Sequence, residues 1–238
     1  MSPRARWLDS RAESGSVPDV RVKICGLIRP EDAQHAAGAG ADYLGAILSE
    51  GFGRSVPAAL AREFAQPGGP PLVAVFVDEP IADVVAKANQ VGASVLQLHG
   101  EESPAVVDEL RREGSWALWK AVRPRSAEEF LRAVDGYGEH ADALLLDGWH
   151  RDLLGGGGVR FPWEVIEEVR GQLPAGIALV AAGGLTSDTV AEAVARLTPD
   201  VVDVSSGVES APRQKDAAKV EAFIRAARAT SSTEGAWA

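Results

Sequence analysis

Short apolar runs recur along the chain, and segments with apolar residues at helical spacing lie between them. The run from Leu72 to Val77 is apolar throughout, as expected for a parallel strand that is covered on both faces. This pattern predicts strands near residues 21–25, 42–48, 71–77, 94–98, 116–121, 142–147, 177–182 and 200–205.

The segments between these runs are amphipathic, and some of them begin with helix-start signals. Ser103 precedes a proline at the first helical position, and Ser126 precedes Ala-Glu-Glu. We predict helices near residues 30–39, 57–66, 80–91, 103–113, 126–136, 162–171, 187–197 and 215–229.

Strand and helix alternate strictly, which is typical of a parallel sheet. Eight such units in about 210 residues favour a closed (β/α)8 TIM barrel, and a doubly wound open sheet is the alternative. The alternation runs without a linker, so we expect one catalytic domain over residues 19–229. Residues 1–18 are rich in Ser, Arg, Glu and Pro and predict a disordered extension, and residues 230–238 predict a flexible tail.

The net charge of −10 argues against nucleic-acid or anionic-membrane partners, which require a basic face. It leaves room for a small anionic substrate that backbone N–H groups can bind. No apolar run is long enough to span a membrane, and no secretory signal follows the N-terminal arginines. The chain has one cysteine and therefore no intramolecular disulfide, which fits a reducing compartment, so we expect a cytoplasmic protein.

Catalytic groups of a (β/α)8 barrel lie at the carboxyl ends of the strands, and two reactive residues fall there. Cys25 ends the first strand, with Lys23 on the same face, where its ammonium group would favour the thiolate. Asp147 ends the sixth strand, across the barrel mouth from the first. A buried structural cysteine and a capping carboxylate are the alternatives for these two positions.

Polar residues in two further places suit a substrate site. Gln97 and His99 alternate with leucine on the fourth strand and are predicted to face the barrel interior. A structural, hydrogen-bonded histidine is the alternative there. Arg54 follows the second strand and suits the recognition of a carboxylate, although a solvated surface arginine is the default expectation for such a position.

Small-residue turns follow the sixth, seventh and eighth strands, at Gly155–Gly158, Gly183–Gly184 and Ser205–Gly207. Phosphate-binding barrels build an anion site from backbone N–H groups after strands seven and eight. The four histidines are scattered and no second cysteine exists, so we expect no metal site. The dinucleotide and P-loop glycine motifs are also absent from the sequence.

Five segments together resemble the phosphoribosylanthranilate isomerase family, and the resemblance covers about residues 21–227. They are KICG (23–26), LQLHG (96–100), LLLD (144–147), AAGGL (181–185) and DVSSGVE (203–209), in this order and at barrel spacing. Lys215-Asp216 downstream also fits the family.

The resemblance implies an Amadori rearrangement in tryptophan biosynthesis, without a metal or cofactor. The substrate would be N-(5-phosphoribosyl)anthranilate and the product 1-(2-carboxyphenylamino)-1-deoxyribulose 5-phosphate. Cys25 would be the general base, Asp147 the general acid, and Arg54 the contact to the anthranilate carboxylate. The remaining substrate-binding positions would be Lys23, Gln97, His99 and Asp203, and the phosphate would lie on Gly157, Gly158, Gly183, Gly184, Ser206 and Gly207.

For this chemistry Asp147 must hold a proton while Cys25 loses one, so we expect the protein to move their two pKa values toward each other. Two other functions remain open. One is that of another phosphate-binding barrel, such as a histidine-pathway sugar isomerase or a bifunctional relative, which would use two aspartates. The other is a degenerate barrel that serves as a binding or scaffold module. The expected partner is a phosphorylated small molecule. The sequence leaves the oligomeric state open, with a monomer slightly favoured.

Overall fold

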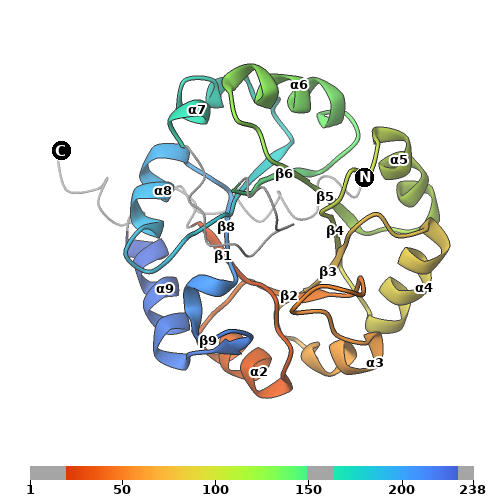
Figure 1. Ribbon diagram of the computed structural model, residues 1–238, viewed down its shortest axis with the longest axis vertical. Helices are drawn as coiled ribbons and strands as arrows, with labels where there is room; N and C mark the ends of the chain where they lie inside the picture. The colour runs from red at the N-terminus through yellow and green to blue at the C-terminus, as the bar shows by residue number, and fades with distance from the viewer. Residues whose placement is uncertain (1–19, 149–162, 230–238) are drawn as a thin grey trace.

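The computed structural model describes residues 20–148 and 163–229. The predicted extension at 1–18 and tail at 230–238 lie outside these residues. Within them the chain forms a closed barrel of parallel strands, which Figure 1 shows with a ring of helices around it. The predicted (β/α)8 barrel is confirmed, and the open sheet is wrong because β1 pairs with β8 and closes the ring.

Each predicted apolar run forms a barrel strand, in chain order. The strands are β1 (Arg21–Ile24), β2 (Tyr43–Ile47), β3 (Leu72–Phe76), β4 (Val95–Leu98), β5 (Ala117–Val122), β6 (Ala143–Leu146), β7 (Ala178–Ala181) and β8 (Val201–Val204). Side chains alternate between the barrel interior and the helix layer, so each strand is buried on both faces.

The helices follow the strands and cover the outside of the barrel. They are α2 (Pro30–Gly38), α3 (Ala58–Ala61), α4 (Ile81–Val91), α5 (Pro104–Glu113), α6 (Ala127–Tyr137), α7 (Glu164–Glu167), α8 (Val190–Leu197) and α9 (Ala217–Ala229). The Ser126 hydroxyl caps α6 by accepting a hydrogen bond from the Glu129 N–H at 3.2 Å, as the sequence predicts. Ser103 precedes Pro104 at the start of α5, but its side chain makes no capping hydrogen bond.

Three elements differ from the predicted helices. The helix after β2 tightens into the 3₁₀ turn η2 (Arg62–Phe64), and α7 is only one turn long before η3 (Arg170–Gln172). After β8 the chain forms η4 (Ser206–Val208) and then a small antiparallel hairpin of β9 (Glu209–Ala211) and β10 (Gln214–Lys215). Lys215 therefore ends a strand rather than opening the last helix.

The barrel lumen combines apolar and polar side chains. The rings of Tyr43 and Trp119 meet edge to face with centroids 5.2 Å apart. Lys23, Gln97 and Asp203 are buried in a lumen otherwise lined by residues such as Val75 and Val180. Burial of charged groups in such surroundings requires that they pair with one another.

No helix in residues 20–148 and 163–229 is both long and apolar enough to cross a membrane.

Candidate active site

The carboxyl end of the barrel brings the predicted reactive residues together. Cys25, His99 and Asp147 are the first residues beyond β1, β4 and β6. Parallel strands of a closed barrel end at one rim, so these side chains share that rim.

Cys25 is buried at the rim, with 7% of its surface exposed, and its neighbour on the same strand face is Lys23. Gly45 on β2 makes this arrangement possible, because a Cβ atom there would lie 2.8 Å from Cys25 Sγ and 3.0 Å from Lys23 Cε. Burial raises the pKa of the Cys25 thiol, and the positive charge of Lys23 offsets only part of this rise.

Lys23 is fully buried and retains its charge through its partners. Its ammonium group donates to Asp203 Oδ2 at 2.8 Å and to Gln97 Oε1 at 2.7 Å. Burial alone would lower the pKa of Lys23, but the negative charges of Asp203 and Cys25 outweigh it and the pKa is raised. Oδ1 of Asp203 is buried and has no hydrogen-bond partner among the described residues.

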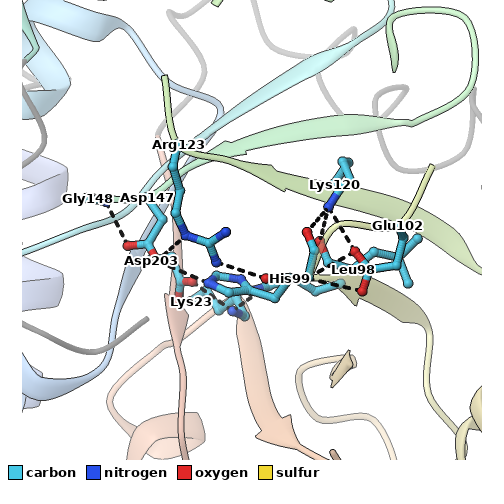
Figure 2. Close-up of polar contacts among 11 residues, drawn as sticks. Lys23, Leu98, His99, Glu102, Lys120, Arg123, Asp147, Gly148 and Asp203 are labelled. Atoms are coloured by element: carbon cyan, nitrogen blue, oxygen red, sulfur yellow. Dashed lines mark hydrogen bonds and ion pairs between the residues drawn. The ribbon is translucent and has the colours of Figure 1, made fainter. Parts of the chain in front are cut away.

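Asp147 accepts hydrogen bonds on both carboxylate oxygens. His99 Nε2 lies 3.0 Å from Oδ2, and the Gly148 N–H donates to Oδ1 at 2.9 Å. The guanidinium of Arg123 approaches Oδ2 to 4.0 Å from the end of β5 and donates to the His99 carbonyl at 2.8 Å. Figure 2 shows Arg123, His99 and Asp147 gathered in this way.

The pKa values of the two reactive groups depart from the sequence-based expectation. Burial would raise the pKa of Asp147, but the hydrogen bond from His99 and the charge of Arg123 lower it below its ordinary value. Because the pKa of Cys25 is raised, the two values move apart. The expected convergence is therefore wrong for this arrangement, because the sequence did not reveal the donors around Asp147 or the depth of Cys25.

Gln97 and His99 face the lumen and the rim, as predicted. Gln97 Nε2 lies 2.9 Å from His99 Nδ1, so the two side chains link Lys23 to Asp147. His99 is thus a hydrogen-bonded residue that also touches the candidate acid.

Arg54 is not a solvated surface residue. Its guanidinium makes a two-point ion pair with Glu209, from Nε to Oε1 at 2.7 Å and from Nη2 to Oε2 at 2.8 Å. Lys215 contacts the same carboxylate at 3.0 Å. Burial would raise the pKa of Glu209, but Arg54 and Lys215 lower it to about 2. The Arg54 stem crosses Gly26, where a Cβ atom would lie 2.6 Å from Arg54 Cδ.

The predicted phosphate turns after β7 and β8 lie against each other. Gly183 and Gly184 both have positive φ, at 81° and 68°, which favours glycine. A Cβ atom on Gly183 would collide with the Gly148 backbone, and one on Gly207 would collide with the Leu185 carbonyl. Ser206 and Gly207 open η4. Gly157 and Gly158 lie outside the described residues.

The sequence did not single out Arg123, Glu209 or Gly45 as site residues. Arg123 follows β5, where a basic residue directly after an apolar strand is a signal of a rim position. Glu209 closes the DVSSGVE segment. An acidic side chain next to a predicted phosphate turn was the available signal that it pairs with a basic residue of the site. Gly45 offered the signal of a glycine inside a strand, which often marks a close approach of other atoms.

Within residues 20–148 and 163–229, no group of three or more His, Cys, Asp or Glu side chains is placed to hold a metal ion.

Residues 22–226 match the family model described as N-(5′-phosphoribosyl)anthranilate isomerase. The chain is 42% identical over 210 residues to the enzyme of that name from Rubrobacter xylanophilus, which covers 87% of this chain and 98% of that protein. The corresponding protein of Pelobacter propionicus is 39% identical over 220 residues, covering 90% and 98%.

Solved structures lead to the same family. The phosphoribosyl anthranilate isomerase of Thermotoga maritima superimposes with a TM-score of 0.79 at 32% identity, covering 88% of this chain and 99% of that one. A structure of phosphoribosyl anthranilate isomerase in complex with reduced 1-(o-carboxyphenylamino)-1-deoxyribulose 5-phosphate has a TM-score of 0.76 at 31% identity, with coverage of 88% and 99%. The resemblance drawn from the five sequence segments is confirmed, and the chain belongs to the N-(5′-phosphoribosyl)anthranilate isomerase family.

Proposed function

We propose that Cys25 is the general base and Asp147 the general acid with which this isomerase of tryptophan biosynthesis converts N-(5-phosphoribosyl)anthranilate into 1-(2-carboxyphenylamino)-1-deoxyribulose 5-phosphate. The observation that carries the assignment is their placement. Both are buried at the same barrel rim, beyond β1 and β6, and a chain of hydrogen-bonded side chains connects their surroundings.

The reaction needs one proton delivered and one removed at different atoms of the sugar. Asp147 donates a proton to the ring oxygen while the bond from that oxygen to C1′ breaks, and the anthranilate nitrogen supplies the electron pair that forms a Schiff base. The thiolate of Cys25 then removes the proton from C2′, which gives an enolamine that tautomerises to the ketone. Acid and base must therefore face different parts of one sugar, which residues on β1 and β6 can do.

Asp147 can act as an acid only if its lowered pKa rises when the substrate binds, and the negative charge of the substrate provides such a rise. The substrate carries a phosphate and a carboxylate, and negative charge near a carboxylic acid raises its pKa. Binding of the substrate would also exclude water from the rim, which acts in the same direction. Lys23 retains its positive charge beside Cys25 and so favours the thiolate.

The substrate's two anionic ends have separate candidate sites. Arg54 is proposed to contact the anthranilate carboxylate while Glu209 holds its guanidinium at the rim. Backbone N–H groups of Gly183, Gly184, Ser206 and Gly207 are proposed to bind the phosphate, with Gly157 and Gly158 completing the site. The unpartnered Oδ1 of Asp203 is available to a substrate hydroxyl group.

We further propose that residues 19–229 form the catalytic domain of a cytoplasmic enzyme without nucleic-acid or membrane partners, with a monomer slightly favoured over an oligomer. The continuous ring of eight strands supports a single domain, and the acidic net charge argues against nucleic-acid and anionic-membrane partners. Light scattering on the purified chain tests the oligomeric state directly.

Turnover of freshly prepared phosphoribosylanthranilate tests the assignment of the residues. The fluorescence of the anthranilate group follows loss of substrate, and the wild-type chain should consume it without added metal or cofactor. The variants Cys25→Ala and Asp147→Asn, folded as judged by circular dichroism, should not. Near-wild-type turnover in either variant would remove that residue from the mechanism.

A further inference from the structure

A single hydrogen-bonded path crosses the barrel from β8 to β6. It runs from Asp203 to Lys23 at 2.8 Å, to Gln97 at 2.7 Å, to His99 at 2.9 Å and to Asp147 at 3.0 Å. Lys23 and Gln97 are at most 1% exposed, so water does not compete for these bonds. The inference drawn from this path rests on the proposed role of Asp147 as general acid.

The chemistry of Lys23 fixes the direction of each bond. An ammonium group can only donate, so the Gln97 atom that faces it must be the amide oxygen. The amide NH2 of Gln97 then faces His99 and must donate, so Nδ1 of His99 carries no proton. The ring proton of a neutral His99 therefore sits on Nε2 and is donated to Asp147 Oδ2.

The same constraint opposes a second proton on His99. An imidazolium ring would place an N–H at Nδ1 against the NH2 group of Gln97 at 2.9 Å, which sets two donors against each other. Turning the Gln97 amide over would relieve that conflict, but it would place the NH2 group against the ammonium of Lys23. The charge of Lys23, acting through Gln97, therefore opposes an imidazolium at His99.

Other charged groups around His99 fit this arrangement. Arg123 at the end of β5 donates to the His99 carbonyl and stands 4.0 Å from Asp147, so its positive charge also opposes an imidazolium. Lys23 on β1 and Asp203 on β8 neutralise each other, and Cys25 lies beside Lys23. Two carboxylates of the loops after β3 and β4 are held by backbone N–H groups: Asp78 accepts from Glu101, and Glu102 accepts from Gly100.

We propose that Gln97 is a positioning residue that holds the His99 ring neutral with its proton on Nε2, and that this allows Asp147 to take up the proton it delivers to the substrate. An imidazolium at His99 would form a full ion pair with Asp147 and would keep that carboxylate ionised. A neutral ring orients the carboxylate with a hydrogen bond and adds no positive charge to it.

Nuclear magnetic resonance of protein labelled with ¹⁵N in its histidine rings measures the proton position without any turnover. The chain has four histidines, and loss of a signal in His99→Gln identifies the one of interest. His99 should show the neutral form with the proton on Nε2 at neutral pH. His140, whose Nδ1 lies 2.8 Å from Asp108 on the outer layer, provides an internal comparison that should be the same in every variant.

Two substitutions change the constraint in opposite ways. In Gln97→Glu a carboxylate can accept from Lys23 with one oxygen and from an Nδ1–H of His99 with the other, so His99 should become an imidazolium at neutral pH. Asp147 should then be harder to protonate, and the basic limb of the kcat profile should move to lower pH. We expect kcat at about pH 8 to fall at least ~10-fold, since one pKa unit corresponds to a tenfold change. The loss should be smaller at about pH 6. Gln97→Met, of similar size, releases the ring and should give a mixture of both neutral forms.

The outcomes separate this inference from the proposed function. An imidazolium at His99 in the wild-type chain, or a wild-type pH profile in Gln97→Glu, would overturn the role of Gln97 even if Asp147→Asn is inactive. An active Asp147→Asn variant would overturn the proposed acid and leave the proton position on His99 to be judged from the spectra alone. Both measurements use the full chain, and the wild-type spectrum decides the first point even where a Gln97 variant fails to fold.

Discussion

Arg54 and Glu209 form a two-point ion pair that joins the loop after β2 to the hairpin after β8, with N–O distances of 2.7 and 2.8 Å. The two residues are 155 positions apart in the sequence. Glu209 also accepts from Lys215 and from the Arg213 N–H, so its carboxylate is held on several sides. A guanidinium fixed in this way keeps a defined orientation at the rim of the barrel.

Removal of Arg54 should weaken substrate binding more than the chemical step. We expect Arg54→Ala to raise KM by ~10-fold or more with a smaller change in kcat, because a charged hydrogen bond is worth roughly 1.5–3 kcal/mol. Glu209→Gln keeps one acceptor for the guanidinium and should raise KM less. Initial rates over a range of substrate concentrations measure both constants, and an unchanged KM in Arg54→Ala would remove its binding role.

The stability of the hairpin end should depend on pH through Glu209. Its pKa in the folded chain is lowered from 4.5 to about 2, so the stabilisation is fully present above pH 4.5 and is lost as the pH falls toward 2. Thermal unfolding from pH 6 to pH 2 should show Tm falling through this window. In Glu209→Gln the fall should be shallower, and equal slopes in the two proteins would contradict the assignment.

Loss of either reacting group should abolish the chemistry while the barrel stays folded. We expect Cys25→Ala and Asp147→Asn to lower kcat by ~10²–10⁴-fold, the range typical of general acid–base catalysis. Cys25→Ser keeps the size but is a far weaker acid, so it should resemble Cys25→Ala rather than the wild type. Single-turnover kinetics with circular dichroism as a fold control distinguish this result from simple unfolding.

The barrel was predictable because short stretches of the sequence are enough to identify each strand and each helix. Each strand is a short run such as Leu144 to Leu146 that is buried on both faces, and the order of strands follows from strict alternation with helices. The short α7 and the β9–β10 hairpin were not predictable in the same way. Tertiary packing rather than helical periodicity decides where Lys215 pairs and where the last helix begins.

The candidate site was predictable only in part. The local sequence shows which residues stand at strand ends, but it does not show which side chains from distant segments pair with them. Strand ends located Cys25, His99 and Asp147. The hydrogen bond and the charge that lower the pKa of Asp147 come from His99 after β4 and Arg123 after β5, and the partner of Arg54 lies 155 positions away. Such contacts depend on barrel closure and on side-chain direction, which the pattern of apolar residues does not specify.

The outer side of the barrel contains a buried ion pair that should matter for stability rather than catalysis. Lys120 on β5 contacts Glu102 at 2.8 Å, and both side chains are almost fully buried. Glu102 also accepts from the N–H groups of Asp78 and Gly100, so it links the loops after β3 and β4 to Lys120 on β5. Figure 2 shows this cluster beside, but separate from, the Asp147 group.

Lys120→Met should leave Glu102 as an unpaired buried carboxylate. We expect a loss of roughly 3–5 kcal/mol in the free energy of unfolding, because removal of one partner of a buried ion pair leaves the other charge buried without compensation. Urea denaturation measures this loss, and kcat at a temperature well below Tm should stay near the wild-type value. A stability change below ~1 kcal/mol would show that Glu102 does not depend on the ion pair.

Gly45 offers the sharpest test of how the lumen positions Cys25. A Cβ atom at this position would lie 2.8 Å from Cys25 Sγ and 3.0 Å from Lys23 Cε, so Gly45→Ala must displace the thiol, the ammonium group or both. Misplacement of a reacting group by ~1 Å can cost ~10²-fold in rate, and we expect kcat to fall at least ~10-fold. The free energy of unfolding should fall by only ~1–3 kcal/mol, the usual cost of overpacking.

Gly136→Ala near the end of α6 is the matched control for Gly45→Ala, since a Cβ atom there meets nothing within 4 Å. The control should keep wild-type kcat and gain up to ~1 kcal/mol of stability from its helix propensity. Equal kcat in the two variants would show that the space at Gly45 is not needed to position Cys25.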